Sequence, residues 1–111
     1  MPHNPLSSFR CDLDPGEDGL ARIRLGGELD MSTVPRLEQT LHEALAHGDR
    51  RLVVDLRALD FMDSTGLALL VRWALGSQRD GYDLALVPGP DRVQRLFELT
   101  SLTSHFTFVD G

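Results

Sequence analysis

The sequence predicts an α/β protein with one mixed, largely parallel β-sheet, an N-terminal β-hairpin, and helices packed mostly on one face. Short apolar segments alternate along the chain with longer segments whose apolar residues recur at helical spacing. Strands that are joined through helices form right-handed crossovers and build a parallel sheet. A dense turn signal at residues 14–19 separates the first two strand candidates, which predicts an antiparallel hairpin on a mixed sheet.

The chain has 111 residues, a length that fits one domain with its own core. Residues 1–8 contain two prolines and two serines, and we expect them to form a flexible tail. Residues 9–111 are expected to form the single domain. The hairpin strands are expected at residues 9–13 and 20–25, and apolar and polar side chains alternate along the second of them.

A helix and a buried strand are expected after the hairpin. Thr33 lies two residues before Pro35, and a hydroxyl residue followed by proline marks a helix start. Apolar residues then recur at helical spacing as far as Leu45, and Gly48 is a suitable stop. Residues 51–56 are apolar and β-branched at their centre, which indicates a buried strand that ends near residue 56.

The second half of the chain is expected to begin with a helix near Asp63. The apolar run from Leu67 to Leu75 is too long and too rich in leucine for one strand, and Gly81 ends it. The remaining elements are expected in this order: a strand at residues 82–87, a turn and helix cap at 88–91, a helix over 93–99, and a short strand at 106–109.

The composition excludes several classes of function. The formal net charge is −6, from 11 basic and 17 acidic residues, and every basic residue is an arginine. The chain therefore lacks the lysine of a P-loop, a Schiff base or a kinase ATP site. Its single cysteine, Cys11, excludes an internal disulfide and a C-x-x-C pair. An acidic chain with scattered arginines also lacks the basic face of a nucleic-acid-binding protein. We expect no cofactor.

Metal, hydrolase and membrane sites are not expected either. His42 and His47 do not share a helix face as a metal-ligand pair would, so we interpret them as surface residues. The chain has no G-x-S-x-G motif. The Gly26-Gly27 pair is not a dinucleotide fingerprint and is interpreted as a β-bulge or turn. No apolar run approaches the roughly 18 residues of a membrane span, and no secretory signal is present, so we expect a reduced cytoplasmic location.

The start of the second predicted helix is the most unusual stretch of the sequence. Asp63 is a suitable N-cap because its carboxylate can accept free amides of the first turn. Ser64 and Thr65 then occupy the first two helical positions. Phe61 and Met62 are expected to anchor the start of the helix. A capped helix start is the simplest interpretation of this stretch.

A phosphate on Ser64 would give this helix start a regulatory role. It would lie at the positive end of the helix dipole beside free amides, so the fold is expected to tolerate it. A partner packed on the site would instead meet about −1.5 to −2 additional charges beside Asp63. The sequence therefore suggests a charge switch at an interface and not a switch of fold.

Three motifs, in order and at matching spacing, are similar to those of one protein family. They are L-G-G-E-L-D at residues 25–30, a segment at residues 56–67 that ends in F-M-D-S-T-G-L, and V-Q-R-L-F-E-L-T at residues 93–100. The chain resembles the STAS-domain anti-sigma factor antagonists, or anti-anti-sigma factors, over about residues 9–109. The D-S-[ST]-G-L string with an aromatic residue before it is the specific part. The resemblance implies a STAS-type fold.

The resemblance implies a bacterial, cytoplasmic regulator that is not an enzyme and is a monomer or weak homodimer. Its unphosphorylated form binds an anti-sigma factor that is a serine kinase, which releases a sigma factor. The kinase phosphorylates the serine after the motif aspartate, here Ser64, and a serine phosphatase reverses this step. Asp30 and Asp63 match acidic positions that flank that serine. The partner-binding residues implied are Asp30, Met31, Ser32, Met62, Asp63, Ser64, Thr65, Gly66 and Leu67.

The sequence departs from the family pattern at two points. Ser101 stands where many relatives have glycine after the third helix, and glycine suits a left-handed turn better. Many relatives also carry another helix after the last strand, whereas the last residue here is Gly111.

Two other classes of function remain open. The chain is alternatively a STAS-domain structural subunit of a membrane lipid-transport complex that acts without phosphorylation. The complete D-S-T-G-L string favours the switch, because a structural subunit does not need a phosphorylatable serine there. An enzyme with Ser64 as its nucleophile is the third hypothesis, although the sequence places no histidine to act as its base.

Overall fold

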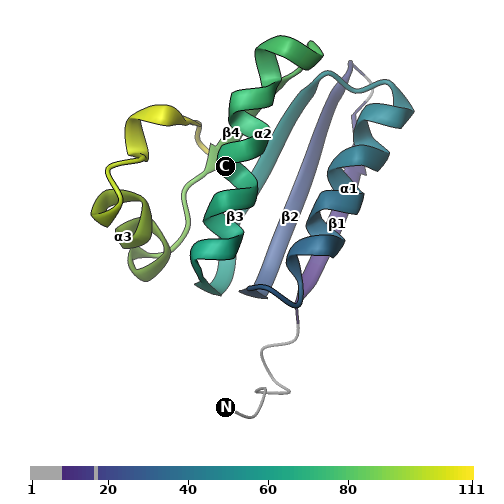
Figure 1. The fold of residues 1–111 in the computed structure, drawn as a ribbon. Helices are drawn as coiled ribbons and strands as arrows, with labels where there is room; N and C mark the ends of the chain where they lie inside the picture. The colour runs from purple at the N-terminus through teal and green to yellow at the C-terminus, as the bar shows by residue number, and fades with distance from the viewer. Residues whose placement is uncertain (1–8, 17) are drawn as a thin grey trace.

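The computed structural model describes residues 9–16 and 18–111, so the tail predicted at residues 1–8 lies outside the described residues. Within them, five strands form one sheet with three α-helices packed beside it (Figure 1). In chain order the elements are β1 (Arg10–Pro15), β2 (Leu20–Leu29), α1 (Val34–His47), β3 (Arg51–Met62), α2 (Ser64–Asp80), β4 (Asp83–Val87), α3 (Asp91–Leu99), the 3₁₀ turn η2 (Thr103–His105) and β5 (Thr107–Phe108).

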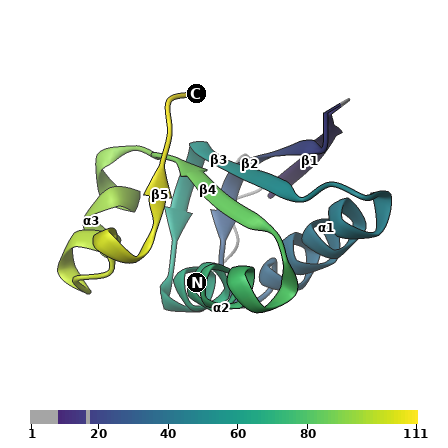
Figure 2. The same cartoon turned by 90° about the horizontal axis from the view of Figure 1, so that it is seen from above.

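The sheet has the strand order β1-β2-β3-β4-β5. The β1–β2 pair is antiparallel, and the other three pairs are parallel. Figure 2 shows α1 and α2 on the same face of the sheet, and α3 contacts both β3 and α2. The predicted fold class is confirmed: an N-terminal hairpin, a largely parallel sheet, and helices mostly on one face.

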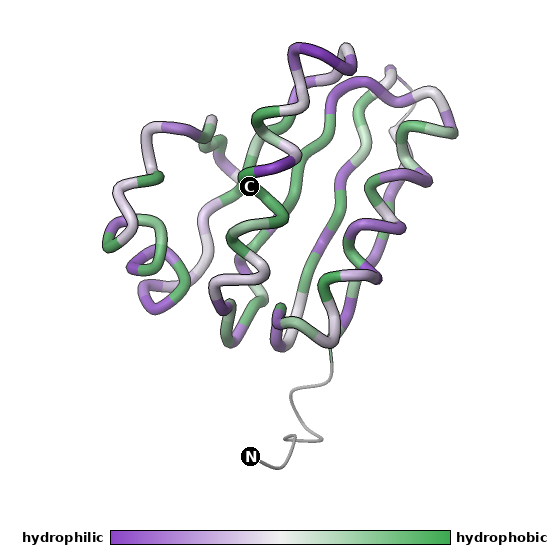
Figure 3. Tube along the Cα trace, viewed as in Figure 1, coloured by the Kyte–Doolittle hydropathy of each residue, from purple (hydrophilic) through white to green (hydrophobic). Residues whose placement is uncertain are grey.

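The main core lies between the sheet and helices α1 and α2. Alternate side chains of β2 and β3 point into it, and the buried ones include Ala21, Ile23, Leu25, Leu52, Val54 and Leu56. Figure 3 shows hydrophobic segments along α2 on both sides of one hydrophilic band, and a hydrophilic end at its C-terminus. Beside α3, the ring of Phe97 packs edge-on against Phe106 and Phe108, with ring centroids 5.2 and 5.6 Å apart.

Strands β2 and β3 extend further than the sequence predicts. The predicted strands end at residues 25 and 56, whereas the observed strands end at Leu29 and Met62. The additional residues pair with one another, Gly27 with Leu59 and Leu29 with Met62, after register shifts that flank the Gly26-Gly27 pair. This pairing satisfies backbone groups in a segment that has no continuous apolar run. The glycines therefore lie at bulges, as predicted, and Gly27 has a φ of 82°.

The helix ends follow the predicted signals. Gly48 and Gly81 directly follow α1 and α2 with φ values of 108° and 73°, a left-handed conformation that suits glycine. Helix α3 begins after Pro90, inside the predicted turn and cap. Ser101 has a φ of 59°, so this serine adopts the left-handed conformation that glycine would adopt more easily.

The face of the sheet opposite α1 and α2 carries charged side chains. Asp55 is 4% exposed and accepts hydrogen bonds from Arg57 Nη2 at 2.7 Å and Arg57 Nε at 3.0 Å. These bonds are the main reason that the pKa of Asp55 lies below its ordinary value. A second pair, Arg24 Nη2 and Asp14 Oδ2, is 3.6 Å apart, and both side chains are more than half exposed. Because exposed ion pairs contribute little, the Asp55–Arg57 pair contributes more to stability than the Arg24–Asp14 pair.

Candidate functional site

The ends of β2 and β3 bring two loops together. Leu29 and Met62 are register partners in these parallel strands, and the backbone N–H of Asp63 donates to the carbonyl oxygen of Leu29 at 3.1 Å. Carboxyl ends of parallel strands meet at one edge of a sheet, which is a common place for functional loops. Asp30 and Asp63 therefore leave the sheet side by side, although they are far apart in the sequence.

Asp63 caps α2, as predicted. Its Oδ1 accepts hydrogen bonds from the backbone N–H groups of Thr65 and Gly66 at 2.9 and 3.1 Å. These bonds satisfy two of the amides that every helix start leaves without an intrahelical partner. The hydroxyl of Thr65 also donates to Asp63 Oδ1, so this hydroxyl is directed back into the cap.

Ser64 is the first residue of α2, and it is exposed. In the part of the chain that the structure describes, its hydroxyl makes no hydrogen bond. The start of a helix favours negative charge, because the aligned peptide dipoles leave it partly positive. The Ser64 hydroxyl is thus accessible and uncommitted, whereas the neighbouring Thr65 hydroxyl is engaged in the cap.

The loop after β2 holds a second aspartate in a fixed position. Asp30 Oδ1 accepts hydrogen bonds from the backbone N–H and the hydroxyl of Ser32, at 2.9 and 2.7 Å. The bond from the Ser32 hydroxyl is the main cause that lowers the pKa of Asp30, so this carboxylate is charged at neutral pH. The hydroxyl of Thr33 donates to the carbonyl oxygen of Glu28 and accepts from the backbone N–H of Asp30, both at 2.9 Å. These bonds tie the loop to β2.

The predicted partner-binding residues divide into an exposed group and a buried group. The exposed or half-exposed residues are Asp30, Met31, Ser32, Asp63, Ser64 and Thr65. The other three, Met62, Gly66 and Leu67, are buried beneath them. Gly66 permits this close packing, because a Cβ there would lie 2.9 Å from Cγ of both Leu29 and Met62. The buried group therefore supports the loops and does not form part of the exposed surface.

Phe61 differs from the expectation that it anchors the helix start with Met62. Phe61 is 47% exposed, whereas Met62 is only 5% exposed. Both residues belong to β3, where consecutive side chains point to opposite faces, so only one of them can enter the core. Met31, in the neighbouring loop, is 77% exposed. The site thus presents two exposed apolar side chains, and the two-residue alternation of an extended β3 is the signal that identifies Phe61.

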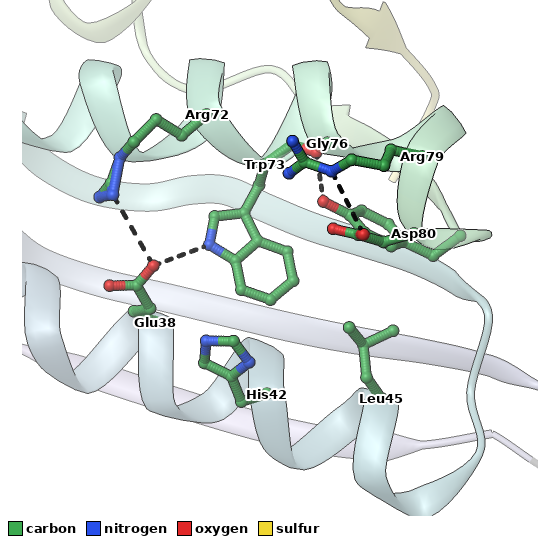
Figure 4. Close-up of a pocket in the computed structure, with 9 residues that line it drawn as sticks. Glu38, His42, Leu45, Arg72, Trp73, Gly76, Arg79 and Asp80 are labelled. Carbon is green, nitrogen blue, oxygen red and sulfur yellow. Dashed lines mark hydrogen bonds and ion pairs between the residues drawn. The ribbon is translucent and has the colours of Figure 1, made fainter.

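A separate pocket of about 210 Å³ lies between α1 and α2 (Figure 4). The indole N–H of Trp73 donates to Glu38 Oε2 at 3.1 Å, and the ring of His42 packs edge-on against Trp73 with centroids 4.9 Å apart. Arg72 Nη1 lies 3.8 Å from the same Glu38 oxygen. These groups interact with one another and hold α1 against α2.

Neither a metal centre nor a membrane span is found in the described part of the chain. Residues 9–16 and 18–111 contain no group of three or more histidine, cysteine, aspartate or glutamate side chains that could hold a metal ion. Among the helices of the same residues, none is long and apolar enough to cross a membrane.

Comparison with known proteins identifies similar sequences. A family model described as "Mlab, STAS domain" matches residues 15–109. The chain is 38% identical over 86 residues to the anti-sigma-B factor antagonist of Staphylococcus aureus strain NCTC 8325, which covers 78% of this chain and 80% of that protein. It is 35% identical over 85 residues to the anti-sigma-B factor antagonist of Staphylococcus epidermidis, which covers 77% of this chain and 79% of the relative.

Solved structures confirm the fold. An anti-sigma factor antagonist from Mycobacterium paratuberculosis matches with a TM-score of 0.76 and 26% identity, over 99% of this chain and 92% of that one. The anti-sigma factor antagonist SpoIIAA in its unphosphorylated form matches with a TM-score of 0.73 and 22% identity, over 92% and 88% of the two chains. The phosphorylated form of SpoIIAA, from Bacillus, matches with a TM-score of 0.67 and 21% identity, over 92% and 91%.

Proposed function

This chain belongs to the STAS-domain family of anti-sigma factor antagonists, and from that premise we propose that it carries a phosphorylation switch at Ser64. The unphosphorylated chain binds an anti-sigma factor that is a serine kinase, which releases a sigma factor and activates transcription. The kinase transfers a phosphoryl group to the Ser64 hydroxyl, which breaks the complex. A serine phosphatase then restores the binding state. The chain is the substrate of this chemistry and not the enzyme.

The contrast between two neighbouring hydroxyls carries this proposal. A kinase needs a hydroxyl that can enter its active site, and the exposed Ser64 hydroxyl is not held by any hydrogen bond within the described residues. The Thr65 hydroxyl would first have to leave its bond to Asp63, which also caps the helix. The geometry therefore favours Ser64 over Thr65 as the phosphate acceptor.

The surface proposed to contact the partner surrounds Ser64. It consists of Asp30, Met31, Ser32, Phe61, Asp63, Ser64 and Thr65, with Met62, Gly66 and Leu67 as its support. Exposed apolar side chains such as Met31 and Phe61 gain free energy when a partner removes them from water. The carboxylates of Asp30 and Asp63 also lie at this surface, so a partner that binds it must present complementary positive charge.

A phosphate on Ser64 acts on the partner more than on the fold. The amides of Thr65 and Gly66 already donate to Asp63, so they are not available as hydrogen-bond donors to the phosphate. The phosphate would be stabilised only by the partial positive charge at the start of the helix. It remains at the surface beside Asp63, where about −1.5 to −2 further charges would face the partner. The likeness to SpoIIAA, solved in both phosphorylated and unphosphorylated forms, supports a fold that accommodates both states.

Phosphate mapping tests this proposal. The wild-type chain, Ser64→Ala and Thr65→Val are incubated with ATP and each anti-sigma factor serine kinase of the source organism, and peptides are examined by mass spectrometry. We expect phosphate on Ser64 in the wild type and in Thr65→Val, and none in Ser64→Ala. Phosphate on Thr65 and never on Ser64 would overturn the site assignment.

A structural subunit of a membrane lipid-transport complex, acting without phosphorylation, is the second candidate function. One observation favours this candidate. The description of the family model that matches residues 15–109 names Mlab and the STAS domain, and it does not name a regulator of sigma factors. Co-purification with a transporter ATPase, together with full function of Ser64→Ala in cells under every condition, would support this candidate over the switch.

A further inference from the structure

We infer that the pocket between α1 and α2 binds a small zwitterion, a free α-amino acid with an apolar side chain. The charged head group of this ligand lies between Arg79 and Asp80, and its side chain packs between Trp73 and Leu45. Ser64 does not line the pocket, so the inference does not depend on the proposed phosphorylation switch.

Residues at helical spacing on two helices form the walls of this pocket. On α1 they include Glu38, His42 and Leu45, and on α2 they include Trp73, Gly76 and Asp80. The volume of about 210 Å³ is smaller than the roughly 300–1,000 Å³ of sites for drug-sized ligands. The pocket therefore suits a small metabolite.

The pocket wall at Gly76 brings opposite charges to one point. Gly76 lies in the interior of α2, where glycine is an unfavourable residue. A Cβ there would lie 3.2 Å from the Tyr82 hydroxyl oxygen, 3.4 Å from Asp80 Oδ2 and 3.5 Å from Arg79 Nη2. The glycine thus leaves open a space on which a carboxylate oxygen and a guanidinium nitrogen converge.

These two converging atoms suit the head group of an α-amino acid. Arg79 and Asp80 contact each other through Arg79 Nε and Asp80 Oδ1, at 3.4 Å, and neither Arg79 Nη2 nor Asp80 Oδ2 makes a hydrogen bond to any described residue. An ammonium group can donate to Asp80 Oδ2 while a carboxylate accepts from Arg79 Nη2. An α-amino acid carries both groups on one carbon atom, which matches this convergence.

The charge balance of the pocket favours a zwitterion over a simple anion or cation. Figure 4 shows the Glu38–Arg72 pair at one end of the pocket and the Arg79–Asp80 pair at the other, with Trp73 between them. The two arginines and the two carboxylates balance one another. A ligand with a single charge would leave one of these groups without a complementary partner.

Trp73 supplies an apolar wall in a fixed orientation. Its indole N–H donates to Glu38 Oε2 at 3.1 Å, and the rings of His42 and Tyr82 pack against it with centroid distances of 4.9 and 5.4 Å. A side chain that is already held loses little further freedom when a ligand binds. An apolar ligand side chain between Trp73 and Leu45 leaves water, which favours binding.

Fluorescence of Trp73 tests the inference, because Trp73 is the only tryptophan of the chain. Leucine, isoleucine, valine, methionine and phenylalanine are each added at up to about 10 mM, a range that detects weak binding. Trp73 emission and the Tm are followed. We expect at least one of these amino acids to shift the emission maximum and to raise the Tm. Its N-acetyl amide, which lacks both head-group charges, is expected to do neither.

Variants of the pocket then locate the ligand. Arg79→Gln and Asp80→Asn each remove one head-group partner at an exposed position, and we expect Kd to rise by about tenfold or more. Asp83→Asn is the matched control, because Asp83 is exposed and does not line this pocket. Gly76→Leu fills the pocket and is expected to abolish binding, whereas Gln78→Leu, on α2 but outside the pocket, is not.

Four results would overturn the inference. The first is unchanged Trp73 emission and Tm with all five amino acids, and the second is equal binding of the N-acetyl amide. The third is wild-type affinity in both Arg79→Gln and Asp80→Asn, which decides the matter even if Gly76→Leu does not fold. The fourth is an equal loss of affinity in Asp83→Asn.

Discussion

Leu29 and Met62 are register partners at the ends of two parallel strands, and both side chains are almost completely buried. Their pairing sets the loops that carry Asp30 and Asp63 side by side. Both side chains also pack at the position of Gly66, so they support the first turn of α2. We therefore expect substitutions in this support to change stability, and substitutions on the exposed surface around Ser64 to change binding.

Removal of the Asp63 cap is expected to destabilise the protein. Asp63→Ala leaves the amides of Thr65 and Gly66 without their acceptor, and the expected loss is about 1 kcal/mol of unfolding free energy. Urea denaturation monitored by circular dichroism measures it. The control is Asp60→Ala, at an exposed position of β3, for which we expect a change within about 0.5 kcal/mol. Equal stabilities of the two variants would contradict the cap.

The neighbours Phe61 and Met62 are expected to respond in opposite ways to truncation. Met62→Ala removes a side chain that is 5% exposed, which costs about 2–5 kcal/mol of stability. Phe61→Ala is expected to cost less than about 1 kcal/mol but to weaken partner binding, because its side chain is 47% exposed. Chemical denaturation and calorimetry with the kinase separate the two effects. A larger loss of stability in Phe61→Ala than in Met62→Ala would mean that Phe61 and not Met62 enters the core, which would contradict the extension of β3 to Met62.

The buried Asp55 predicts a pH-dependent contribution to stability. Arg57 lowers the pKa of Asp55 below its ordinary value of 3.8, so the charged carboxylate stabilises the folded state. That contribution is complete above the ordinary pKa and is lost as the pH falls toward the lowered one. We expect Asp55→Asn to be less stable than the wild type by about 1 kcal/mol at pH 7, with a difference that shrinks below pH of about 4.

Thermal unfolding of both proteins across this pH range measures the Asp55 effect. Asp14→Asn is the control, because its ion pair with Arg24 is exposed and is expected to contribute less than about 0.5 kcal/mol. A difference between wild type and Asp55→Asn that stays constant from neutral to acidic pH would contradict this account.

The left-handed Ser101 predicts a stabilising substitution. Ser101→Gly removes the steric cost of a φ of 59° and is expected to raise stability by up to about 1 kcal/mol. Ser104→Gly, at an exposed residue without a positive φ, only increases the freedom of the unfolded chain and is expected to give no gain. Thermal unfolding compares the two variants, and a gain in Ser104→Gly as large as in Ser101→Gly would refute the role of backbone conformation.

Local signals in the sequence predicted the centre of the site. Asp63 as an N-cap, Ser64 as the first helical residue and Gly81 as a helix stop depend only on near neighbours, and the structure has all three. The resemblance to the family motifs indicated that Asp30 belongs to the same site as Ser64, and no local pattern in the sequence indicates this.

Long-range contacts determined what the sequence did not predict. The extension of β3 to Met62 depends on pairing with β2, since residues 57–62 form no apolar run of their own. The exposure of Phe61 follows from that extension. The two cavities that Val71 and Leu102 line likewise lie between segments that are distant in the chain, so no pattern within either segment indicates them.

The affinity of one kinase for the chain with serine or phosphoserine at position 64 tests the central claim most directly. Both forms are purified, and calorimetry with the kinase and ADP measures each Kd. We expect phosphoserine to weaken binding by at least about tenfold, and Ser64→Ala to keep the wild-type affinity within about threefold. Equal affinity of the phosphorylated and unphosphorylated chains would contradict a switch at Ser64.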